Sequence, residues 1–207
     1  MVLEIKKVLH FLISIGGMTI MSIYTKRIIS NSYYHIYNRG NNNERIFYNE
    51  DNHVYFLRKY NEYMSDFIRT YAFCLLPNHF HFLIKTSENS ELVSEQFRKF
   101  FKTYAEKINW QTGRSGSLFL KPFKRKIITS DNYLKRMVFY VHYNPVHHKF
   151  SESFEDYKWS SYKRILNPQK TNLEKEEVLG MFGGTEDYVL FHKDLSNLKE
   201  INEFVIE

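Results

Sequence analysis

The spacing of hydrophobic and polar residues changes along the chain between the period of a strand and the period of a helix. Residues 31–40 (NSYYHIYNRG) are rich in aromatic and β-branched side chains and lead into a polar loop, which predicts a strand. Residues 49–67 place apolar side chains three and four positions apart, which predicts a helix. Two apolar runs, residues 69–76 and 79–86, flank the turn Pro77-Asn78 and predict an antiparallel hairpin.

The next part of the chain repeats these types of element. A helix with a basic second half is expected over residues 87–109, followed by an extended basic segment over residues 118–129. Residues 130–145 form a predicted helix that is capped at its start and ended by Pro145, because proline cannot continue the helical hydrogen bonds.

Two shorter helices are expected near residues 159–165 and 174–181. The resulting order, β-α-β-β-α-β-α, predicts a ferredoxin-like α+β fold. In this fold class two central antiparallel strands lie beside outer ones, and helices cover one face of the sheet. A fold of this kind hosts many functions, so it does not identify one.

The chain is expected to contain three segments. Residues 1–20 hold an apolar run that is far shorter than the ~20 residues of a membrane helix, and no small-residue cleavage site follows it. We expect these residues to form a disordered extension. Residues 21–170 are predicted to form one folded domain, and residues 171–207 an acidic helix and tail.

Composition indicates a folded protein of a reducing compartment. Of the 207 residues, 43% are hydrophobic and 17% are aromatic, which is enough for a core and argues against general disorder. The lone cysteine, Cys74, lies in an apolar run and is expected to be a core residue. Because one cysteine allows no disulfide, a cytoplasmic location is expected.

The net charge of +6 is unevenly distributed. From residue 171 onward the chain holds three lysines and nine acidic residues, whereas the first 170 residues hold 26 basic and 14 acidic ones. A basic body suggests a nucleic-acid partner, although ordinary solvated surface explains the charge equally well. Cations bind phosphate and aromatic rings stack on unpaired bases. The predicted DNA contacts are Arg98, Lys99, Lys102, Lys121, Lys124, Arg125 and Lys126.

The run HFHFLIKT at residues 79–86 contains two histidines in an otherwise apolar strand. Side chains alternate between the faces of a strand, so His79 and His81 share one face and the phenylalanines share the other. Two imidazoles roughly 6–7 Å apart at Cα suit a clamp on one metal ion. Two histidines that hydrogen-bond within the sheet are the alternative. A histidine-triad hydrolase needs a histidine where Leu83 stands, and a zinc finger needs more ligands.

The predicted helix that ends at Pro145 offers a candidate nucleophile for such a site. Tyr140 and Asn144 are four residues apart and therefore project from one helical face. A phenol and an amide oxygen could then approach the same ion, whereas His142 lies about 200° round the helix from Tyr140. From this helix alone, an ordinary half-buried tyrosine is the simpler interpretation.

The motifs PNHFHFLIK, GSLF, YLKRMVFYVHYNPV, DYKWSSY and LGMFGG follow one another between about residue 32 and about residue 188. In type and order they resemble those of the REP-associated branch of the single-tyrosine HUH transposases. The resemblance implies that His79 and His81 are the metal-binding pair, that Tyr140 is the nucleophile and that Asn144 is a third, amide-bearing ligand. The loop Asn38-Arg39-Gly40 resembles a family landmark beside the active site, which adds Arg39 to the expected DNA contacts.

The resemblance implies that residues 21–170 form a transposase domain that cleaves and rejoins single-stranded DNA near hairpins. Tyr140 would attack a backbone phosphorus, form a 5′-phosphotyrosine bond and release a 3′-hydroxyl, and a second 3′-hydroxyl could reverse the step. The implied cofactor is Mg²⁺ or Mn²⁺, although imidazole ligands by themselves favour zinc, copper or nickel. The implied partner is single-stranded or hairpin DNA, with no membrane and no small-molecule substrate. This branch favours a monomer over a dimer that exchanges tyrosine helices.

Two other functions stay open at this point. One is a catalytically inactive module that recognises nucleic-acid hairpins, for which His79, His81 and Tyr140 would serve no purpose. The other is a metal-dependent phosphodiesterase that uses water in place of the tyrosine. A covalent protein–DNA adduct separates the three functions.

Overall fold

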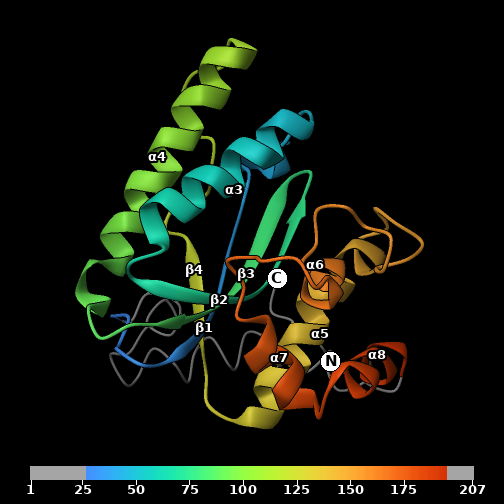
Figure 1. Ribbon diagram of the computed structural model, residues 1–207. Helices are drawn as coiled ribbons and strands as arrows, with labels where there is room; N and C mark the ends of the chain where they lie inside the picture. Colours follow the sequence, from blue (N-terminus) through green and yellow to red (C-terminus); the bar gives the residue numbers. More distant parts are fainter. Residues whose placement is uncertain (1–26, 195–207) are drawn as a thin grey trace, which may run out of the picture.

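Figure 1 shows the computed structural model, which describes residues 27–194. The extension predicted at residues 1–20 lies outside the described residues, as does the end of the acidic tail. Within residues 27–194, no helix is both long enough and apolar enough to cross a membrane.

Four strands form one antiparallel sheet in the order β2-β3-β1-β4. They are β1 (Tyr33–Arg39), β2 (Ile68–Leu76), β3 (His79–Thr86) and β4 (Lys124–Ile128). The first and third strands are central and the second and fourth lie at the edges, which is the ferredoxin-like arrangement. The predicted α+β fold class is therefore confirmed.

The alternation of side chains along β3 divides the core into two clusters. Phe80, Phe82 and Ile84 are fully buried on one face of the sheet. Leu83 is buried on the opposite face, which His79 and His81 share with it. We call the first the phenylalanine face and the second the histidine face.

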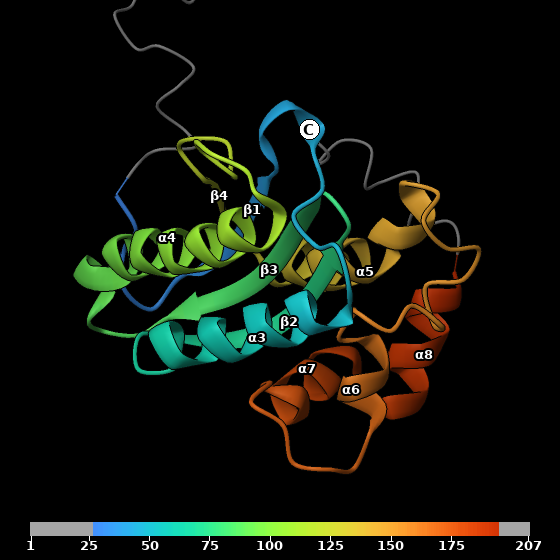
Figure 2. The ribbon, with the colours of Figure 1, turned by 90° about the horizontal axis from the view of Figure 1, so that it is seen from above.

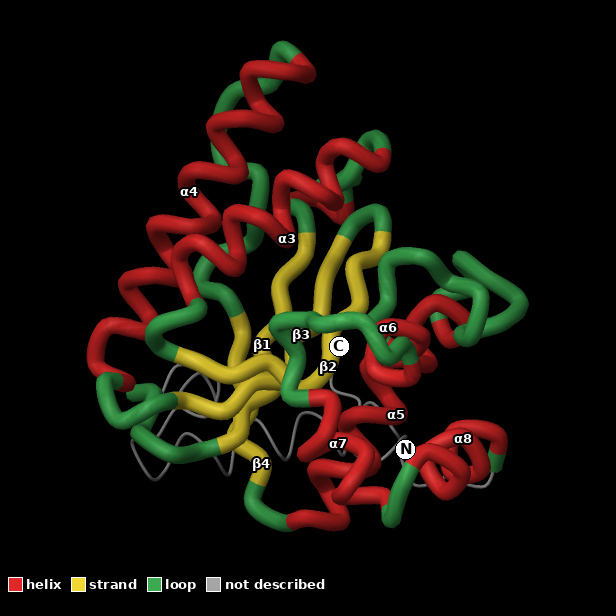
Figure 3. The backbone as a smooth tube through the Cα atoms, in the orientation of Figure 1, coloured by secondary structure: helices red, strands yellow, loops and turns green. Residues whose placement is uncertain are grey.

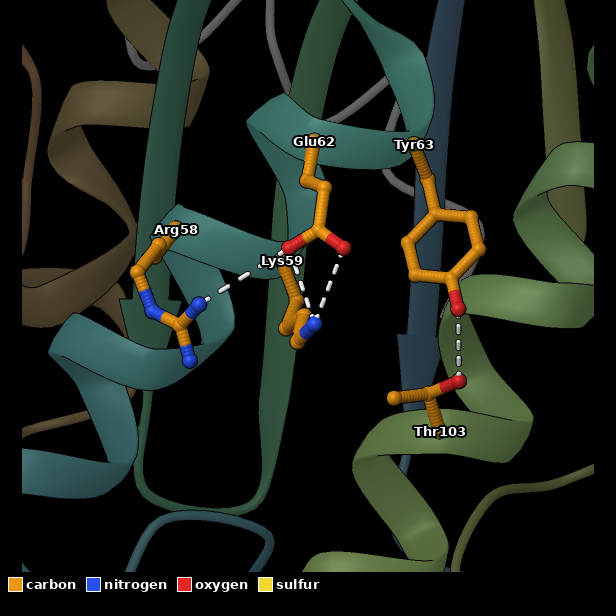
Figure 4. Close-up of polar contacts among 5 residues, drawn as sticks. All are labelled: Arg58, Lys59, Glu62, Tyr63 and Thr103. Carbon is orange, nitrogen blue, oxygen red and sulfur yellow. Dashed lines mark hydrogen bonds and ion pairs between the residues drawn. The ribbon is translucent and has the colours of Figure 1, made fainter.

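Two helices cover the phenylalanine face, α3 (Glu50–Met64) and α4 (Val93–Thr112). Tyr60 of α3 stacks on Phe82 with ring centroids 4.0 Å apart. Figure 4 shows how the two helices are joined: the Tyr63 hydroxyl lies 2.9 Å from Thr103 Oγ1, beside an ion pair within α3. Asn52 Nδ2 of α3 also donates to Gln111 Oε1 of α4 at 2.9 Å, so aromatic packing and polar contacts together hold this layer.

The prediction that helices cover only one face is wrong. The helix α5 (Asp131–His147) packs on the histidine face, and α6 (Tyr162–Leu166), α7 (Lys175–Phe182) and α8 (Thr185–Lys193) gather around it. Figures 1 and 2 show these helices on the opposite side of the molecule from α3 and α4, and Figure 3 shows the strands between the two groups. The physical reason is that the histidine face also carries apolar residues that need cover, among them Cys74, Leu76 and Leu83.

The outer edge of β2 is closed by the segment that precedes α6. The Leu75 amide donates to Trp159 O at 2.9 Å, and the Ser161 amide donates to Phe73 O at 2.9 Å. The helix expected near residues 159–165 therefore begins only at Tyr162, because Trp159 pairs with the strand instead. This pairing protects an edge strand that would otherwise present open hydrogen-bonding groups.

The helix that was expected to end at Pro145 continues to His147. Pro145 lies in its last turn, where a missing amide hydrogen removes a single helical hydrogen bond. The His148 amide donates to Asn144 O at 2.9 Å and the Phe150 amide donates to Pro145 O at 2.8 Å, so the helix end is still closed. Asn144 therefore keeps helical geometry.

Two other elements, β4 and α8, differ from the prediction. Only residues 124–128 of the extended segment pair with β1, and the preceding residues form a loop that pairs with the sheet through Phe119 and Gly40. The helix α8 was not expected, because its sequence is largely polar. Its two buried residues, Tyr188 and His192, are nevertheless completely enclosed.

Candidate active site

Strand β3 places His79 and His81 side by side on the histidine face, with ring centroids 5.1 Å apart. Both side chains are buried, at 4% and 1% exposure. Nδ1 of His79 lies 2.6 Å from Asn78 Oδ1, and Nδ1 of His81 lies 2.8 Å from His35 Nε2. Because Nδ1 of each ring is engaged, Nε2 is the nitrogen through which each ring can bind a cation.

His81 is held in the neutral form that a metal ligand requires. Burial lowers its pKa well below the ordinary histidine value, and nearby cationic and imidazole groups (His35, His79, His148 and Arg39) lower the pKa further. A neutral imidazole offers a lone pair, whereas an imidazolium does not. The environment therefore favours a ligand at this position over a charged side chain.

The helix α5 brings Tyr140 to the same face of the sheet. Its ring is 4% exposed and meets the His81 ring edge to face with centroids 5.7 Å apart. The His35 ring lies in a similar orientation at 5.9 Å. A phenol and the histidine pair thus lie together within one chain, although they are about 60 residues apart in the sequence.

Asn144 is fully buried one turn after Tyr140. Its Nδ2 donates to the Tyr140 carbonyl oxygen at 2.8 Å, while its Oδ1 makes no hydrogen bond within the described residues. A buried amide oxygen without a partner costs roughly 1–3 kcal/mol. A bound cation would remove this cost, so the atom fits a metal ligand.

Two imidazoles and one amide oxygen form a donor set suited to a divalent cation. Over residues 27–194, no group of three or more His, Cys, Asp or Glu side chains is arranged to hold a metal ion. Any cation here would therefore rely on Asn144, on water and on substrate oxygens to complete its coordination. Mg²⁺ and Mn²⁺ commonly bind in this way, whereas structural Zn²⁺ usually has four protein ligands.

Three neighbours of the pair were not identified from the sequence. Asn78 and His35 orient the imidazoles through the hydrogen bonds described above. The His148 ring lies edge to face against His79 with centroids 4.5 Å apart. The spacing of four residues from Tyr140 to Asn144 and again to His148 is a signal that could have identified His148.

A small cavity of about 30 Å³ opens beside the pair, which is roughly the volume of one water molecule. Arg39 lies opposite His79 in the β1–β3 register and lines this cavity. Tyr140 contacts His81 from α5, and neither Tyr140 nor Asn144 lines the cavity. A Cβ at Gly40 would lie 2.1 Å from Glu44 O, so only glycine fits this turn. The cavity is lined by Tyr37, Asn38, Arg39, His79, His81, Leu120, Pro122 and Lys124.

A groove of about 1030 Å³ runs between α4 and the loop before β4. Asn38, Leu120 and Pro122 line both the groove and the small cavity, so the two are adjacent. Glu106 also lines the groove and its phenylalanines are only 5–8% exposed, but its walls otherwise combine cationic and aromatic side chains. These are Arg98, Lys102, Lys121, Arg125, Phe101, Phe119 and Phe123.

Strand alternation divides the predicted basic run between the two faces. Lys124 and Lys126 lie on the histidine face, since they pair with Tyr37 and His35 of β1. Arg125 lies on the other face and donates to Ser94 Oγ of α4 at 3.1 Å.

Lys99 lines neither the cavity nor the groove. Its ammonium group forms an ion pair with Glu95 at 2.8 Å on the exposed surface of α4. Among the predicted DNA contacts, Lys99 is therefore one that lies away from both the cavity and the groove and is occupied by an ion pair.

No protein-family model matches the chain. A curated protein of Haemophilus influenzae, which bears the provisional name of a REP-associated tyrosine transposase, is 28% identical over 109 residues. The match spans 48% of this chain and 62% of that protein, so the chain covers about three-fifths of the relative's length.

A solved structure is described as a REP-associated tyrosine transposase bound to a REP hairpin. It superposes with a TM-score of 0.60 and 16% identity, over 69% of this chain and 84% of the other. At that identity the likeness concerns the fold. Together the two comparisons confirm the resemblance to REP-associated tyrosine transposases that the motifs indicated.

Proposed function

We propose that the chain is a metal-dependent transposase or endonuclease that cleaves and rejoins single-stranded DNA beside hairpins. The observation that carries this proposal is the position of Tyr140, whose ring lies 5.7 Å from His81 on one face of one sheet. A module that only binds DNA has no need for a buried phenol against two buried imidazoles.

In the proposed reaction the Tyr140 hydroxyl attacks a backbone phosphorus. The bond from the tyrosine oxygen to phosphorus forms, the bond from phosphorus to the 3′-oxygen breaks, and the freed 3′-oxygen takes a proton. The phosphotyrosine bond conserves the energy of the phosphodiester, so a second 3′-hydroxyl can attack it and join two strands. No external energy source is needed.

His79, His81 and Asn144 are the residues that would hold the cation. Bound there, Mg²⁺ or Mn²⁺ supplies positive charge to a nonbridging phosphate oxygen as the phosphorus becomes crowded. Asn78 and His35 would keep both imidazoles in the orientation that the cation requires.

The groove beside the cavity is suited to the DNA strand. Its cationic side chains can neutralise phosphates, and the exposed edges of its phenylalanines offer apolar contact to unpaired bases. On the histidine face, Arg39, Lys124 and Lys126 would meet the strand at the reacting phosphate, whereas Lys99 would contribute least. The solved structure with a similar fold is described as bound to a REP hairpin, which supports hairpin DNA as the substrate.

A single chain supplies both the histidine pair and the tyrosine. This arrangement supports action as a monomer, since no exchange of tyrosine helices between two chains is required.

The test is covalent capture of DNA. The chain is incubated with a single-stranded hairpin oligonucleotide and Mn²⁺, and the adduct is separated on a denaturing gel. Tyr140→Phe should remove the adduct, whereas Tyr143→Phe, a half-buried tyrosine on the same helix, should retain it. Chelation of the cation should also remove the adduct.

The alternatives predict different outcomes of the same assay. Hairpin binding with no cleavage in the wild-type chain would indicate a binding module. Cleavage that persists in Tyr140→Phe would indicate a phosphodiesterase that uses water.

A further inference from the structure

A chain of buried hydrogen bonds runs from β2 through α5 to α8, away from the candidate metal site. Ser161, His142 and His192 form it, and each is 0% exposed. Ser161 Oγ lies 2.7 Å from His142 Nε2, and His142 Nδ1 lies 2.9 Å from His192 Nε2. A backbone group closes each end: the Phe73 amide at 2.8 Å from Ser161 Oγ and the Tyr188 carbonyl at 2.8 Å from His192 Nδ1.

The two backbone ends determine where each proton lies. A carbonyl oxygen can only accept, so His192 must donate through Nδ1. Burial lowers the pKa of His192 to about 4, so at neutral pH its Nε2 carries a lone pair and accepts from His142 Nδ1.

The remaining proton belongs to the Ser161 hydroxyl. With a single ring proton on Nδ1, His142 accepts through Nε2, and the serine hydroxyl is the donor within reach. The alternative acceptor, Phe73 O, lies farther away at 3.2 Å and already accepts from the Ser161 amide. All the bonds therefore run in one direction, from Phe73 to Tyr188, with both imidazoles protonated on Nδ1.

This chain of bonds is well placed to control the tyrosine helix. His142 lies between Tyr140 and Asn144 in sequence, but its partners are Ser161 and His192, whereas Tyr140 contacts His81. Its anchor on β2 is next to the histidine pair, because Phe73 and Cys74 pair with Phe82 and His81 in the sheet. The hydrophobic effect that holds α5 on the sheet is non-directional, whereas hydrogen bonds require a defined distance and angle.

We propose that the Ser161–His142–His192 chain of hydrogen bonds is a positioning device that sets the register of α5, and hence the place of Tyr140, against the sheet. The inference rests on the proposed function, since it concerns the tyrosine of that reaction. It makes Ser161, the second serine of the motif WSSY, and the C-terminal helix α8 contributors to catalysis without contact with DNA. Misplacement of a reacting group by about 1 Å can cost about a hundredfold in rate.

The test separates positioning from general support of the fold. His192→Leu removes the nearer acceptor for His142 Nδ1 and leaves only the Tyr188 hydroxyl at 3.3 Å. His192→Gln keeps an oxygen that can accept at the same distance along the side chain. His147→Leu, at an exposed position on α5, is the matched control. We expect His192→Leu to lower the single-turnover rate of adduct formation at least tenfold with the dissociation constant for hairpin DNA within twofold of wild type. His192→Gln should recover most of the rate.

A second measurement needs no variant and no DNA. Nitrogen-15 spectra of the imidazole side chains of the wild-type chain at neutral pH should show His142 and His192 both neutral and both protonated on Nδ1. Free histidine prefers the other tautomer, so the result is discriminating.

Three results would overturn the inference. One is a folded His192→Leu variant with an unchanged rate, and another is an equal loss in His192→Gln and His192→Leu. The third is protonation of either ring on Nε2. Absence of any adduct in the wild-type chain would instead overturn the proposed function, and the positioning role with it, while the spectra would still decide the order of the protons.

Discussion

The two faces of the sheet are built from alternate residues of the same strands, and they differ in kind. On the phenylalanine face, Phe80 and Phe82 pack among aromatic side chains of α3 and α4. On the histidine face, His79 and His81 alternate with these phenylalanines in sequence, and the His81 ring meets Tyr140 of α5. One strand therefore contributes a core on one side and a candidate reaction centre on the other.

The comparison teaches how a small domain separates stability from chemistry. Aromatic burial is favourable in itself, so the phenylalanine face needs no specific partners. Each polar group on the histidine side needs a partner of defined position, such as Asn78 for His79 and His192 for His142. Damage to the first face should reduce stability, and damage to the second should reduce activity.

The largest effect is expected from the histidine face. His81→Gln preserves size but removes a nitrogen ligand, and a catalytic cation is worth several kcal/mol in the transition state. Adduct formation should fall about a thousandfold or more, with the thermal unfolding midpoint close to that of wild type. Retention of Mn²⁺-dependent adduct formation would remove His81 from the proposed site.

Its neighbour on the opposite face should show the reverse behaviour. Phe82→Ala deletes a fully buried ring that stacks on Tyr60, and the free energy of unfolding should fall by about 3–5 kcal/mol. Urea denaturation measures the change. Leu190→Ala, at a side chain that is 65% exposed, is the control and should change stability by less than about 0.5 kcal/mol. A loss below about 1 kcal/mol in Phe82→Ala would show that the face is not a cooperative core.

Acid should weaken the side of the molecule that α5 and α8 form. In the unfolded chain His192 takes up a proton below about pH 6.5, whereas in the folded chain burial lowers the pKa of His192 to about 4. Stability is therefore lost as the pH falls from 6.5 to 4, by about 3 kcal/mol for this residue. Unfolding free energies measured across this range should show a shallower slope in His192→Gln, and equal slopes would contradict the assignment.

The smallest of the four effects concerns a residue that orients the pair. Asn78→Ala removes the acceptor for His79 Nδ1, and losses of this type typically weaken metal binding about 10–100-fold. Calorimetric titration with Mn²⁺ measures the affinity directly. Asn172→Ala, at an exposed site, should leave the affinity unchanged. A matching affinity in both variants would show that Asn78 does not orient the pair.

Much of the fold was predictable because the local pattern and the tertiary packing agree. The alternation in HFHFLIKT placed His79 and His81 on one face, and the helical spacing placed Tyr140 and Asn144 together. The cover of the histidine face by α5 was missed, because a period of two identifies faces but not the elements that cover them. The helix α8 was missed because most of its residues are polar.

The neighbours of the histidine pair were harder to identify than the pair itself. His35 and Asn78 are ordinary members of a strand and a turn, and their role depends on contacts across the sheet. The division of Lys124 and Arg125 between two faces needed the register of β4 against β1. The residues of β4 alone do not specify how this strand aligns with β1.

The sequence by itself determined the types of element, the shared face of the two histidines and the resemblance to a family of transposases, because these depend on residues close together in the chain. Only the tertiary structure decided that Tyr140 lies against His81, that the basic residues of β4 divide between the two faces of the sheet, and that His142 joins β2 to α8. Such contacts join segments tens of residues apart. Their geometry follows from how the two faces of the sheet bury their apolar surface, which no local pattern specifies.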